Sequence, residues 1–357
     1  MIGPFPDPIS GVSLANEVSE VFLSKQPNLR VLRINTSFPS FDEDLGSFSF
    51  RKFFFYFSLN VSLYKVFICD KVYLTPGQTF FGVVKYGFFV LLASSLGKEL
   101  IIHVHGNYLS KSYNSLKGVK KRLFSFFISK FDKGIVLSES LKPNLEPFLN
   151  AEKIYVLPNF AQDYLLSDGE PFCEEMRIVF LSNLMKEKGI IEVLQSLDFL
   201  QKNGINFKAR IAGAIDPQNK HELLGLINNI DNCSYLGVVK NKDKRKLLQW
   251  SNIFILPTFY EMEGQPISIL EAMATQNLII TTKHAGIPDI VKEKDNGFFV
   301  NKQDTKSIQD LLMYLTDHKE IIREISLNNK AYFLDGFTQE KFENRLLEII
   351  KDELPRS

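Results

Sequence analysis

Short apolar runs alternate with longer segments of helical periodicity along almost the whole chain. Such runs are buried on both faces, as parallel strands are when helices cover both sides of their sheet. The alternation therefore predicts an α/β fold. The expected strands lie at 31–34, 72–75, 100–104, 134–137, 154–157, 178–181, 208–212, 234–236, 253–256, 278–281 and 297–300. The expected helices lie at 11–24, 78–96, 115–130 and 139–149, and others begin near 188, 217, 242, 264, 288 and 304.

The length predicts more than one domain, because 357 residues exceed what a single hydrophobic core usually supports. A polar segment with two prolines and one glycine, residues 158–175, separates two halves of the alternation and is typical of a linker. We expect an N-terminal domain over 1–160 and a C-terminal domain over 175–320. Helices over 321–357 have no following strand, and we expect them to pack outside a sheet or to cross back to the N-terminal domain.

Charge and cysteine usage exclude several classes of protein. The 42 basic and 41 acidic residues give a net charge of +1, so the excess of positive charge typical of nucleic-acid binding is absent. Cys69, Cys173 and Cys233 lie far apart, which predicts neither a disulfide framework nor a zinc site. We expect a cytoplasmic protein with no nucleic-acid partner and no metal.

Phenylalanine is unusually frequent, at 32 of 357 residues, and its densest stretches fall in the first 150 residues. The most apolar segments, 53–69 and 80–96, are interrupted by Asn60, Lys65 and Lys85. Both fall short of the roughly 20 apolar residues that cross a membrane. We interpret them as buried helices, and the alternative is that one lies in a membrane.

The segment 111–133 combines seven basic residues and one acidic residue with five interleaved aromatics. This pattern is typical of peripheral contact with an anionic membrane surface, at the inner face of the cytoplasmic membrane. The alternative is an ordinary sheet-covering helix with Val119, Leu123 and Phe126 facing inward. Because the basic character is confined to one helix of a neutral chain, a nucleic-acid platform is disfavoured.

Residues 257–274 form the most informative segment. An apolar strand precedes them, Gly264 and Pro266 follow, and Ile267, Leu270 and Met273 recur at helical spacing. The pattern predicts a strand, a loop and the start of a buried helix near Gly264. The free N–H groups and the positive dipole end of such a helix suit a phosphate or a diphosphate.

Two carboxylates bracket this helix start. Glu263 is expected at its mouth, and Glu271 lies eight residues on, roughly 12 Å along a helix that rises 1.5 Å per residue. An ionised carboxylate only accepts hydrogen bonds, and a vicinal diol offers two donors. The segment therefore predicts a nucleotide diphosphate-sugar site, and the alternative is a solvated helix face.

An ordered series of motifs resembles the family-four retaining glycosyltransferases, strongly over 177–300 and loosely over 38–98. The segment EGQPISILEAMA holds both glutamates and is followed by AGIPDIV and DNGFFV. Upstream stand, in order, GPFPDPISGVS, HVHG, IVLSES, VLPNF, FLSNLMKEKGI, ARIAGA, SYLGVV and WSNIFILPT.

This resemblance implies the GT-B fold, with two Rossmann-like domains facing a cleft. It implies retaining transfer of a hexose-type sugar from a nucleotide diphosphate-sugar, UDP rather than GDP, without a metal or another cofactor. The acceptor would be a hydroxyl of a glycan or a polyprenyl-linked saccharide in surface polysaccharide biosynthesis. Front-face transfer is implied, in which the departing phosphate oxygen takes the acceptor's proton.

The resemblance also implies residue roles. Glu263, Lys188 and His105 would be catalytic. The donor would contact Glu271, Gly264, Gln265, Pro266, Asn183, Gly213, Val238, Gly11 and Ser10. The acceptor would contact His105, Asn107, Ser138 and Asn159. Structural alternatives stay open: an exposed lysine at Lys188, a core histidine at His105, a helix N-cap at Ser138 and a turn at Asn159.

One position departs from the family pattern. Family members commonly carry an arginine where this chain has Asn183, and an amide supplies no charge against a leaving diphosphate. Lys186, close in sequence, can compensate. Two other functions remain open: a sugar-nucleotide epimerase, which would need a base at the sugar, and a non-catalytic nucleotide-sugar-binding partner subunit.

Overall fold

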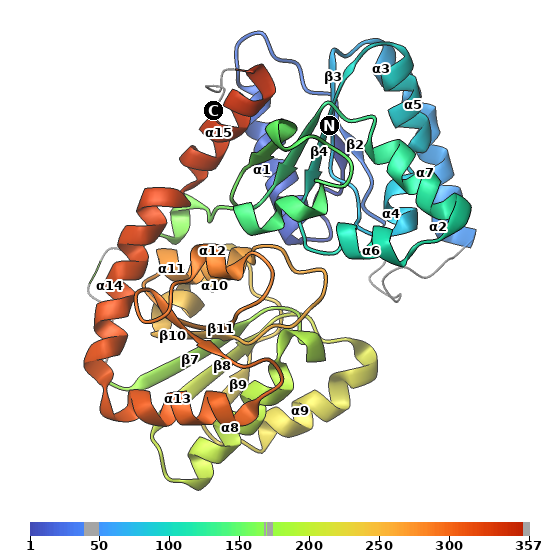
Figure 1. Cartoon of the computed structure of the whole chain (residues 1–357). Helices are drawn as coiled ribbons and strands as arrows, with labels where there is room; N and C mark the ends of the chain where they lie inside the picture. The colour runs from blue at the N-terminus through green and yellow to red at the C-terminus, as the bar shows by residue number, and fades with distance from the viewer. Residues whose placement is uncertain (39–49, 168, 170–173, 353–357) are drawn as a thin grey trace. The chain divides into compact units, whose positions relative to one another are not determined.

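The computed structural model describes residues 1–38, 50–167, 169 and 174–352, and it contains two compact units (Figure 1). Cys173 and part of the expected linker lie outside the described residues. Unit 1 holds Met1–Pro158, the short segment Met262–Gln265 and the chain from Phe342 onward. Unit 2 holds Asn159–Glu261 and Pro266–Lys341.

Unit 1 is built on a six-stranded parallel sheet with the order β2-β1-β3-β4-β5-β6. Its central strands are rich in Val and Ile and are buried on both faces, as the apolar runs predict. The strands are β1 (Ile2–Gly3), β2 (Ile34–Asn35), β3 (Lys71–Leu74), β4 (Glu99–Val104), β5 (Lys133–Val136) and β6 (Ile154–Val156).

Helices cover both faces of this sheet (Figure 1). The chain runs from β1 to β2 in one direction and from β2 through β6 in the other, so right-handed crossovers place α1 opposite the later helices. α15 packs on the α1 side within unit 1 (Figure 1). The helices are α1 (Gly11–Ser24), α2 (Phe50–Ser58), α3 (Tyr64–Phe67), α4 (Phe80–Val84), α5 (Gly87–Ser95), α6 (Leu109–Ser115), α7 (Gly118–Ile128) and α15 (Gln339–Lys351).

Two expected helices of unit 1 take a different form. The helix expected over 78–96 is interrupted between α4 and α5, where Gly87 packs so closely on Phe127 that a Cβ would lie 2.7 Å from its ring. The helix expected over 139–149 is a 3₁₀ turn, Glu139–Asn144, because Pro143 interrupts the α-helical hydrogen bonding. Further 3₁₀ turns lie at Leu59–Leu63 and Ala151–Lys153.

The interpretation of 53–69 and 80–96 as buried helices is wrong for much of their surface. Phe54 is 66% exposed, Phe67 is 59% exposed and Phe88 is 60% exposed. The inward face expected for the basic segment is also wrong. Val119 is 79% exposed and Phe126 is 45% exposed, while neighbouring aromatics of α7 fill the core.

Unit 2 is a second six-stranded parallel sheet with the order β12-β11-β10-β7-β8-β9. Every strand expected between 178 and 300 is present to within three residues at either end. The strands are β7 (Met176–Leu181), β8 (Phe207–Ala212), β9 (Cys233–Tyr235), β10 (Ile253–Leu256), β11 (Leu278–Thr282) and β12 (Gly297–Val300).

The helices of unit 2 bury one apolar core with these strands. They are α8 (Ile190–Lys202), α9 (Lys220–Asn228), α10 (Asn241–Trp250), α11 (Ile267–Ala274), α12 (Ile287–Ile290), α13 (Thr305–Asp317) and α14 (Lys319–Gly336), with 3₁₀ turns at Asp163–Leu165, Lys186–Lys188 and Pro217–Asn219. In the part of the chain that the structure describes, no helix is both long and apolar enough to span a bilayer.

A buried lysine fastens α15 to the sheet of unit 1. The Nζ atom of Lys133 lies 2.7 Å from the carboxylate of Glu99, pairs with Asp352 and donates to the carbonyl oxygen of Ile349 at 2.9 Å. Its side chain is 7% exposed. Lys71 also pairs with both carboxylates, so removing Lys133 leaves them one lysine instead of two and leaves the Ile349 carbonyl without this donor.

We therefore predict that Lys133→Met lowers the free energy of unfolding by about 2 kcal/mol, a value reduced from the fully buried case because both carboxylates are partly exposed. Urea unfolding measures this change, and limited proteolysis should show earlier cleavage within α15. Lys202→Met, which removes an exposed lysine paired with Asp198, is the control. Equal effects of the two substitutions would contradict the assigned anchor.

Candidate functional site

Both units carry their candidate residues at the carboxyl edge of a parallel sheet, where open α/β sheets bind ligands. In unit 1, the loop before α1 follows β1, His105 follows β4 and Ser138 follows β5. In unit 2, Lys188 lies in the connection after β7, and Gly213 directly follows β8. The candidates thus form two clusters, one in each unit.

Two histidines form the centre of the cluster in unit 1. His103 is fully buried at the end of β4, and its ring centroid lies 3.9 Å from that of His105. The hydroxyl of Tyr73 hydrogen-bonds Nδ1 of His103. Both ring nitrogens of His105 are shielded from solvent, and within the described ranges neither has a hydrogen-bond partner.

Burial sets the charge of this pair. Loss of solvation lowers the pKa of His105 to about 3, and burial together with the neighbouring His105 lowers the pKa of His103 well below its ordinary value. His105 is therefore neutral at physiological pH. A neutral imidazole offers one donor and one acceptor to a ligand, but no positive charge.

The segment Met262–Gln265 packs against the histidine loop within unit 1. A Cβ on Gly264 would lie 2.4 Å from the carbonyl oxygen of His105, and a Cβ on Gly106 would lie 2.4 Å from that of Met262. Gln78 reinforces the contact by donating to the Met262 carbonyl at 3.3 Å. The two glycines thus permit a backbone contact that holds Glu263, itself 8% exposed, in the same unit as His105.

Asn107 and Ser138, two expected acceptor residues of unit 1, each follow a residue that contacts the segment Met262–Gln265. Gln265 donates to the Leu137 carbonyl at 3.5 Å, directly before Ser138. Ser138 is buried and hydrogen-bonds the Ser140 hydroxyl at 3.2 Å, and it does not cap the 3₁₀ turn that follows. The carboxamide oxygen of Asn107 accepts from Asn144 at 3.1 Å.

The N-terminal loop ends in a capped helix. The Ser10 hydroxyl accepts from the Ser13 amide at 3.1 Å, and the Ser13 hydroxyl accepts from the Ser10 amide at 2.7 Å, which is a capping box. Ser10 thus has a structural role in starting α1. Gly11 is exposed in the first turn, and its expected donor contact stays a prediction.

In unit 2, helix α11 begins three residues later than expected. Pro266 is its N-cap, no side chain caps it, and the partly exposed Ile267 and Ser268 form its first turn. Glu263 therefore precedes the helix by four residues, and the expected 12 Å rise between the two glutamates does not apply. Proline has no N–H of its own and disfavours helical backbone at the residue before it, which shifts the start to Ile267.

Glu271 is 4% exposed on α11, so the solvated-face alternative is wrong for this residue. Its carboxylate pairs with the Nζ atom of Lys244 on α10. Burial disfavours the charge on Lys244, but the attraction and hydrogen bond of Glu271 outweigh burial and raise the pKa of Lys244. The sequence did not single out Lys244, which lies in a run of charged residues at 240–246.

Lys188 ends the 3₁₀ turn after β7, and its Nζ atom lies 4.8 Å from the ring centroid of Tyr260. The next residue, Gly189, has a φ of +80°, and a Cβ there would lie 2.6 Å from the carbonyl oxygen of Pro257. Glycine is therefore required where the loops after β7 and β10 touch. Lys188 is only partly exposed at this junction, whereas Asn183 and Lys186 are exposed.

The remaining donor candidates of unit 2 differ in what they can contact. Gly213 has a φ of +144°, and a Cβ would lie 1.7 Å from the Ser182 carbonyl oxygen, so its position requires glycine for packing. Val238 is 59% exposed. Asn159, expected to contact the acceptor, is the first residue of unit 2 and is buried.

Two other features carry no ligand assignment. Across the described ranges, no group of three or more His, Cys, Asp or Glu side chains is placed to hold a metal ion.

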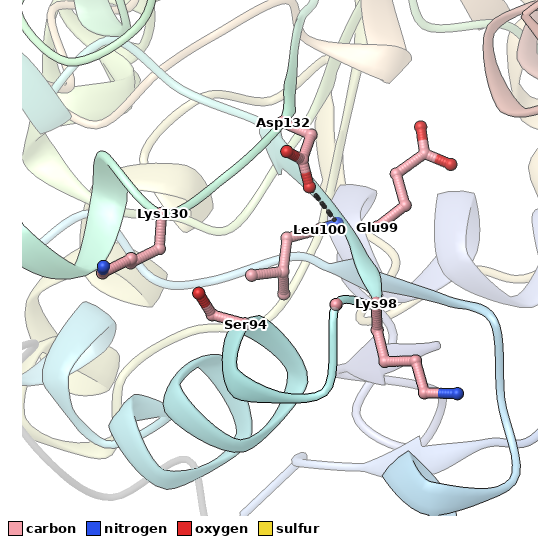
Figure 2. Close-up of a pocket in the computed structure, with 7 residues that line it drawn as sticks. Ser94, Lys98, Glu99, Leu100, Lys130 and Asp132 are labelled. Atoms are coloured by element: carbon pink, nitrogen blue, oxygen red, sulfur yellow. Dashed lines mark hydrogen bonds between the residues drawn. The ribbon is translucent and has the colours of Figure 1, made fainter.

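A hollow of about 440 Å³ lies at the amino end of β4, opposite His105 (Figure 2). There Asp132 accepts from the Leu100 amide at 2.9 Å, and two lysines balance two carboxylates.

Comparison with known proteins agrees with the motif series. Residues 168–332 match the family model of glycosyl transferases group 1. The matched segment covers a little less than half of the chain. It contains Lys188, Gly213, Lys244 and Glu271, together with the loop that carries Glu263.

Two curated relatives are similar to this chain at low identity. The amylovoran biosynthesis glycosyltransferase AmsK of Erwinia amylovora is 23% identical over 50% of this chain and 45% of its own length. The UDP-Gal:alpha-D-GlcNAc-diphosphoundecaprenol alpha-1,3-galactosyltransferase of Escherichia coli is 25% identical over 51% of this chain and 41% of its own length. The chain thus matches less than half of each relative.

A solved structure extends the likeness to most of the chain. The Anabaena protein HepE in complex with UDP superposes with a TM-score of 0.69 at 15% identity, over 83% of this chain and 82% of HepE. At this identity the likeness establishes the fold. The fold is GT-B, as the motif series predicts, and the segment that matches the family model lies largely in its second Rossmann-like unit.

The neutral histidine pair makes stability depend on pH. In the unfolded chain both imidazoles bind protons below their ordinary pKa near 6.5, whereas His105 in the folded chain stays neutral to about pH 3. Stability is therefore fully present above about pH 6.5 and falls as the pH drops, by about 1.4 kcal/mol per pH unit for each histidine. We predict that His105→Gln reduces the pH dependence of the free energy of unfolding between about pH 7 and about pH 5. The reduction should correspond to about one fewer proton taken up on unfolding.

The measurement is the midpoint of thermal unfolding of the wild type and the variant across this pH range. His221→Gln, at an exposed histidine, should keep the wild-type slope. A wild-type slope in His105→Gln would show that His105 is not buried in its neutral form.

Proposed function

We propose that the chain is a retaining family-four glycosyltransferase that moves a hexose-type sugar from a UDP-sugar to a hydroxyl of a glycan or a polyprenyl-linked saccharide in surface polysaccharide biosynthesis. The single observation that carries this proposal is the placement of Lys188 and the start of α11 at the carboxyl edge of one sheet, with the buried Glu271 four residues into that helix, inside the segment that matches the family model. The names of AmsK and of the galactosyltransferase support the acceptor class, and the UDP complex of HepE supports the nucleotide.

The donor would lie along the carboxyl edge of unit 2. Its diphosphate would accept from the backbone N–H groups at the uncapped start of α11 and from Lys188. Its ribose hydroxyls would donate to Glu271, whose carboxylate pairs with Lys244. Gly189 and Gly213 let the backbone of neighbouring loops approach closely around this region.

The transfer would occur on one face of the sugar. The acceptor oxygen bonds to the anomeric carbon as the bond from that carbon to the phosphate oxygen breaks, and the departing oxygen takes the acceptor's proton. Lys188 and the start of α11 stabilise the negative charge that develops on the diphosphate. Glu263 would accept from sugar hydroxyls, and the neutral His105 would orient the sugar without supplying an acid or a base.

We predict distinct kinetic effects for the two ends of the donor. Lys188→Ala should lower kcat by about a hundredfold or more, because it removes charge that matters most as the diphosphate leaves. Glu271→Ala should mainly raise KM for the donor, by about tenfold or more, because the ribose is bound similarly in ground and transition states. Release of UDP from a panel of UDP-sugars measures both.

Lys220→Ala, at an exposed lysine of unit 2, is the matched control and should leave both constants unchanged. Glu263→Ala should abolish UDP release. Equal losses of kcat in Lys188→Ala and Glu271→Ala would contradict the assigned roles. Tight UDP-sugar binding with no turnover in the wild type would favour the non-catalytic partner subunit, for which Asn183 is the motivating position.

We further predict that transfer needs no divalent metal, because Lys188 and the dipole of α11 supply the positive charge that a metal would otherwise bring to the diphosphate. The rate of UDP release should stay unchanged after treatment with EDTA and removal of the chelate. A loss of rate that added Mg²⁺ or Mn²⁺ restores would overturn this part of the proposal.

A further inference from the structure

One side of unit 1 exposes an unusual number of large apolar side chains. We call these side chains the aromatic face. They come from the helices between β2 and β5 and are exposed by between 39% and 80%. The members are Phe54, Phe57, Val61, Tyr64, Phe67, Ile68, Phe81, Phe88, Leu91, Leu96, Val119 and Phe126.

The topology of the sheet brings these residues to one side. The connections from β2 to β3, from β3 to β4 and from β4 to β5 all run in the same direction, so their helices share one face of the sheet. The helices also contact one another, because α3 and α7 both pack on α5 and α4 packs on α7. Figure 1 shows this layer on the side of the sheet opposite α1 and α15.

The exposed residues are additional to those that fill the core. Phe89 on α5 and Phe124 and Phe127 on α7 face the sheet and are 7% exposed or less. The outward positions of the same helices are taken by Phe88, Leu91 and Phe126. α5 is therefore apolar on both sides, and α7 exposes Phe126 beside its basic residues, whereas a surface helix of a globular protein normally has a polar outer face.

The charge of this region is strongly biased. Between Phe54 and Phe131 the only acidic residues are Asp70 and Glu99, and Glu99 pairs with Lys71 and Lys133. Ten basic residues fall in the same stretch of a chain whose net charge is +1. They are Lys65, Lys71, Lys85, Lys98, Lys111, Lys117, Lys120, Lys121, Arg122 and Lys130.

Lysines also lie beside aromatic rings of these helices, both exposed and partly exposed. The Nζ atom of Lys85 lies 3.9 Å from the ring centroid of Tyr56, and that of Lys130 lies 4.9 Å from the ring centroid of Phe126. Lys120 lies 5.8 Å from the ring centroid of Phe80. Positive charges beside apolar rings match the boundary between anionic headgroups and acyl chains.

We propose that the aromatic face rests on the surface of an anionic membrane, with its rings at the headgroup boundary and its lysines among the acidic headgroups. Contact would be interfacial, because no helix among the described residues is long and apolar enough to cross a bilayer. The face extends well beyond the basic segment 111–133 and includes the Phe-rich helices α2, α3 and α5. Aliphatic members such as Val61, Ile68 and Leu91 favour a membrane over nucleic acid, since they cannot stack on bases.

Co-sedimentation of the full chain with vesicles tests this proposal. We compare vesicles of phosphatidylcholine alone with vesicles that contain about one third phosphatidylglycerol. We expect binding to the anionic vesicles only. Lys117→Glu with Lys120→Glu should lower the partition coefficient at least about twentyfold, since each basic residue near an anionic surface accounts for about fivefold.

A second variant tests the apolar part. Phe88→Ser with Leu91→Ser should lower partitioning at least about tenfold, the size expected when a large buried side chain is lost. Two control variants lie in unit 2. Leu327→Ser with Leu334→Ser also removes two exposed apolar side chains, and Lys220→Glu with Lys246→Glu makes the same change of charge as the lysine variant of unit 1. Both control variants should bind like the wild type.

Three results would overturn the proposal: no vesicle binding by the wild type, equal binding to neutral and anionic vesicles, or equal losses in the controls. A concentration-dependent dimer that Phe88→Ser with Leu91→Ser abolishes, without vesicle binding, would instead assign the face to a second copy of the chain. The vesicle experiment contains no sugar donor, so its outcome does not depend on the proposed transfer reaction. Wild-type midpoints of thermal unfolding in all four variants show that they fold.

Discussion

The parallel direction of the strands is the constraint on which the rest of the structure depends. Because all six strands of a unit end at the same edge, residues that are far apart in sequence meet there without any specific long-range signal. In unit 2 this edge collects Lys188, Gly213 and the start of α11, and in unit 1 it collects His105 and Ser138. The buried ion pair of Glu271 and Lys244 then holds the Glu271 carboxylate in place just behind the edge.

The sequence predicted β7 to β12 in the expected order and to within two residues, but in unit 1 the strand expected at 31–34 meets β2 only at Ile34. It did not predict the orientation of the Phe-rich helices of unit 1. Apolar residues occur on both the buried and the exposed sides of α5 and α7, so periodicity did not show which side faces the sheet. Exposed Val119 and buried Phe124 on α7 show the resulting error.

The candidate site was predictable only where a motif marked it. Glu263 and Glu271 were found through their spacing in one segment, although α11 starts at Ile267 and only Glu271 lies on it. Lys244 was missed because it lies 27 residues from Glu271, within a charged run that resembles an exposed helix. The packing of Gly264 on the His105 loop depends on backbone proximity, which no local pattern reports.

Equilibrium titration of UDP into the full chain tests the central claim most directly, which is that the carboxyl edge of unit 2 binds the nucleotide through Glu271. The account predicts that the wild type binds UDP, that Glu271→Gln weakens binding at least about tenfold through loss of charged hydrogen bonds, and that Glu263→Gln leaves the affinity unchanged. Absence of UDP binding by the wild type, or equal affinities of the wild type and Glu271→Gln, would contradict it.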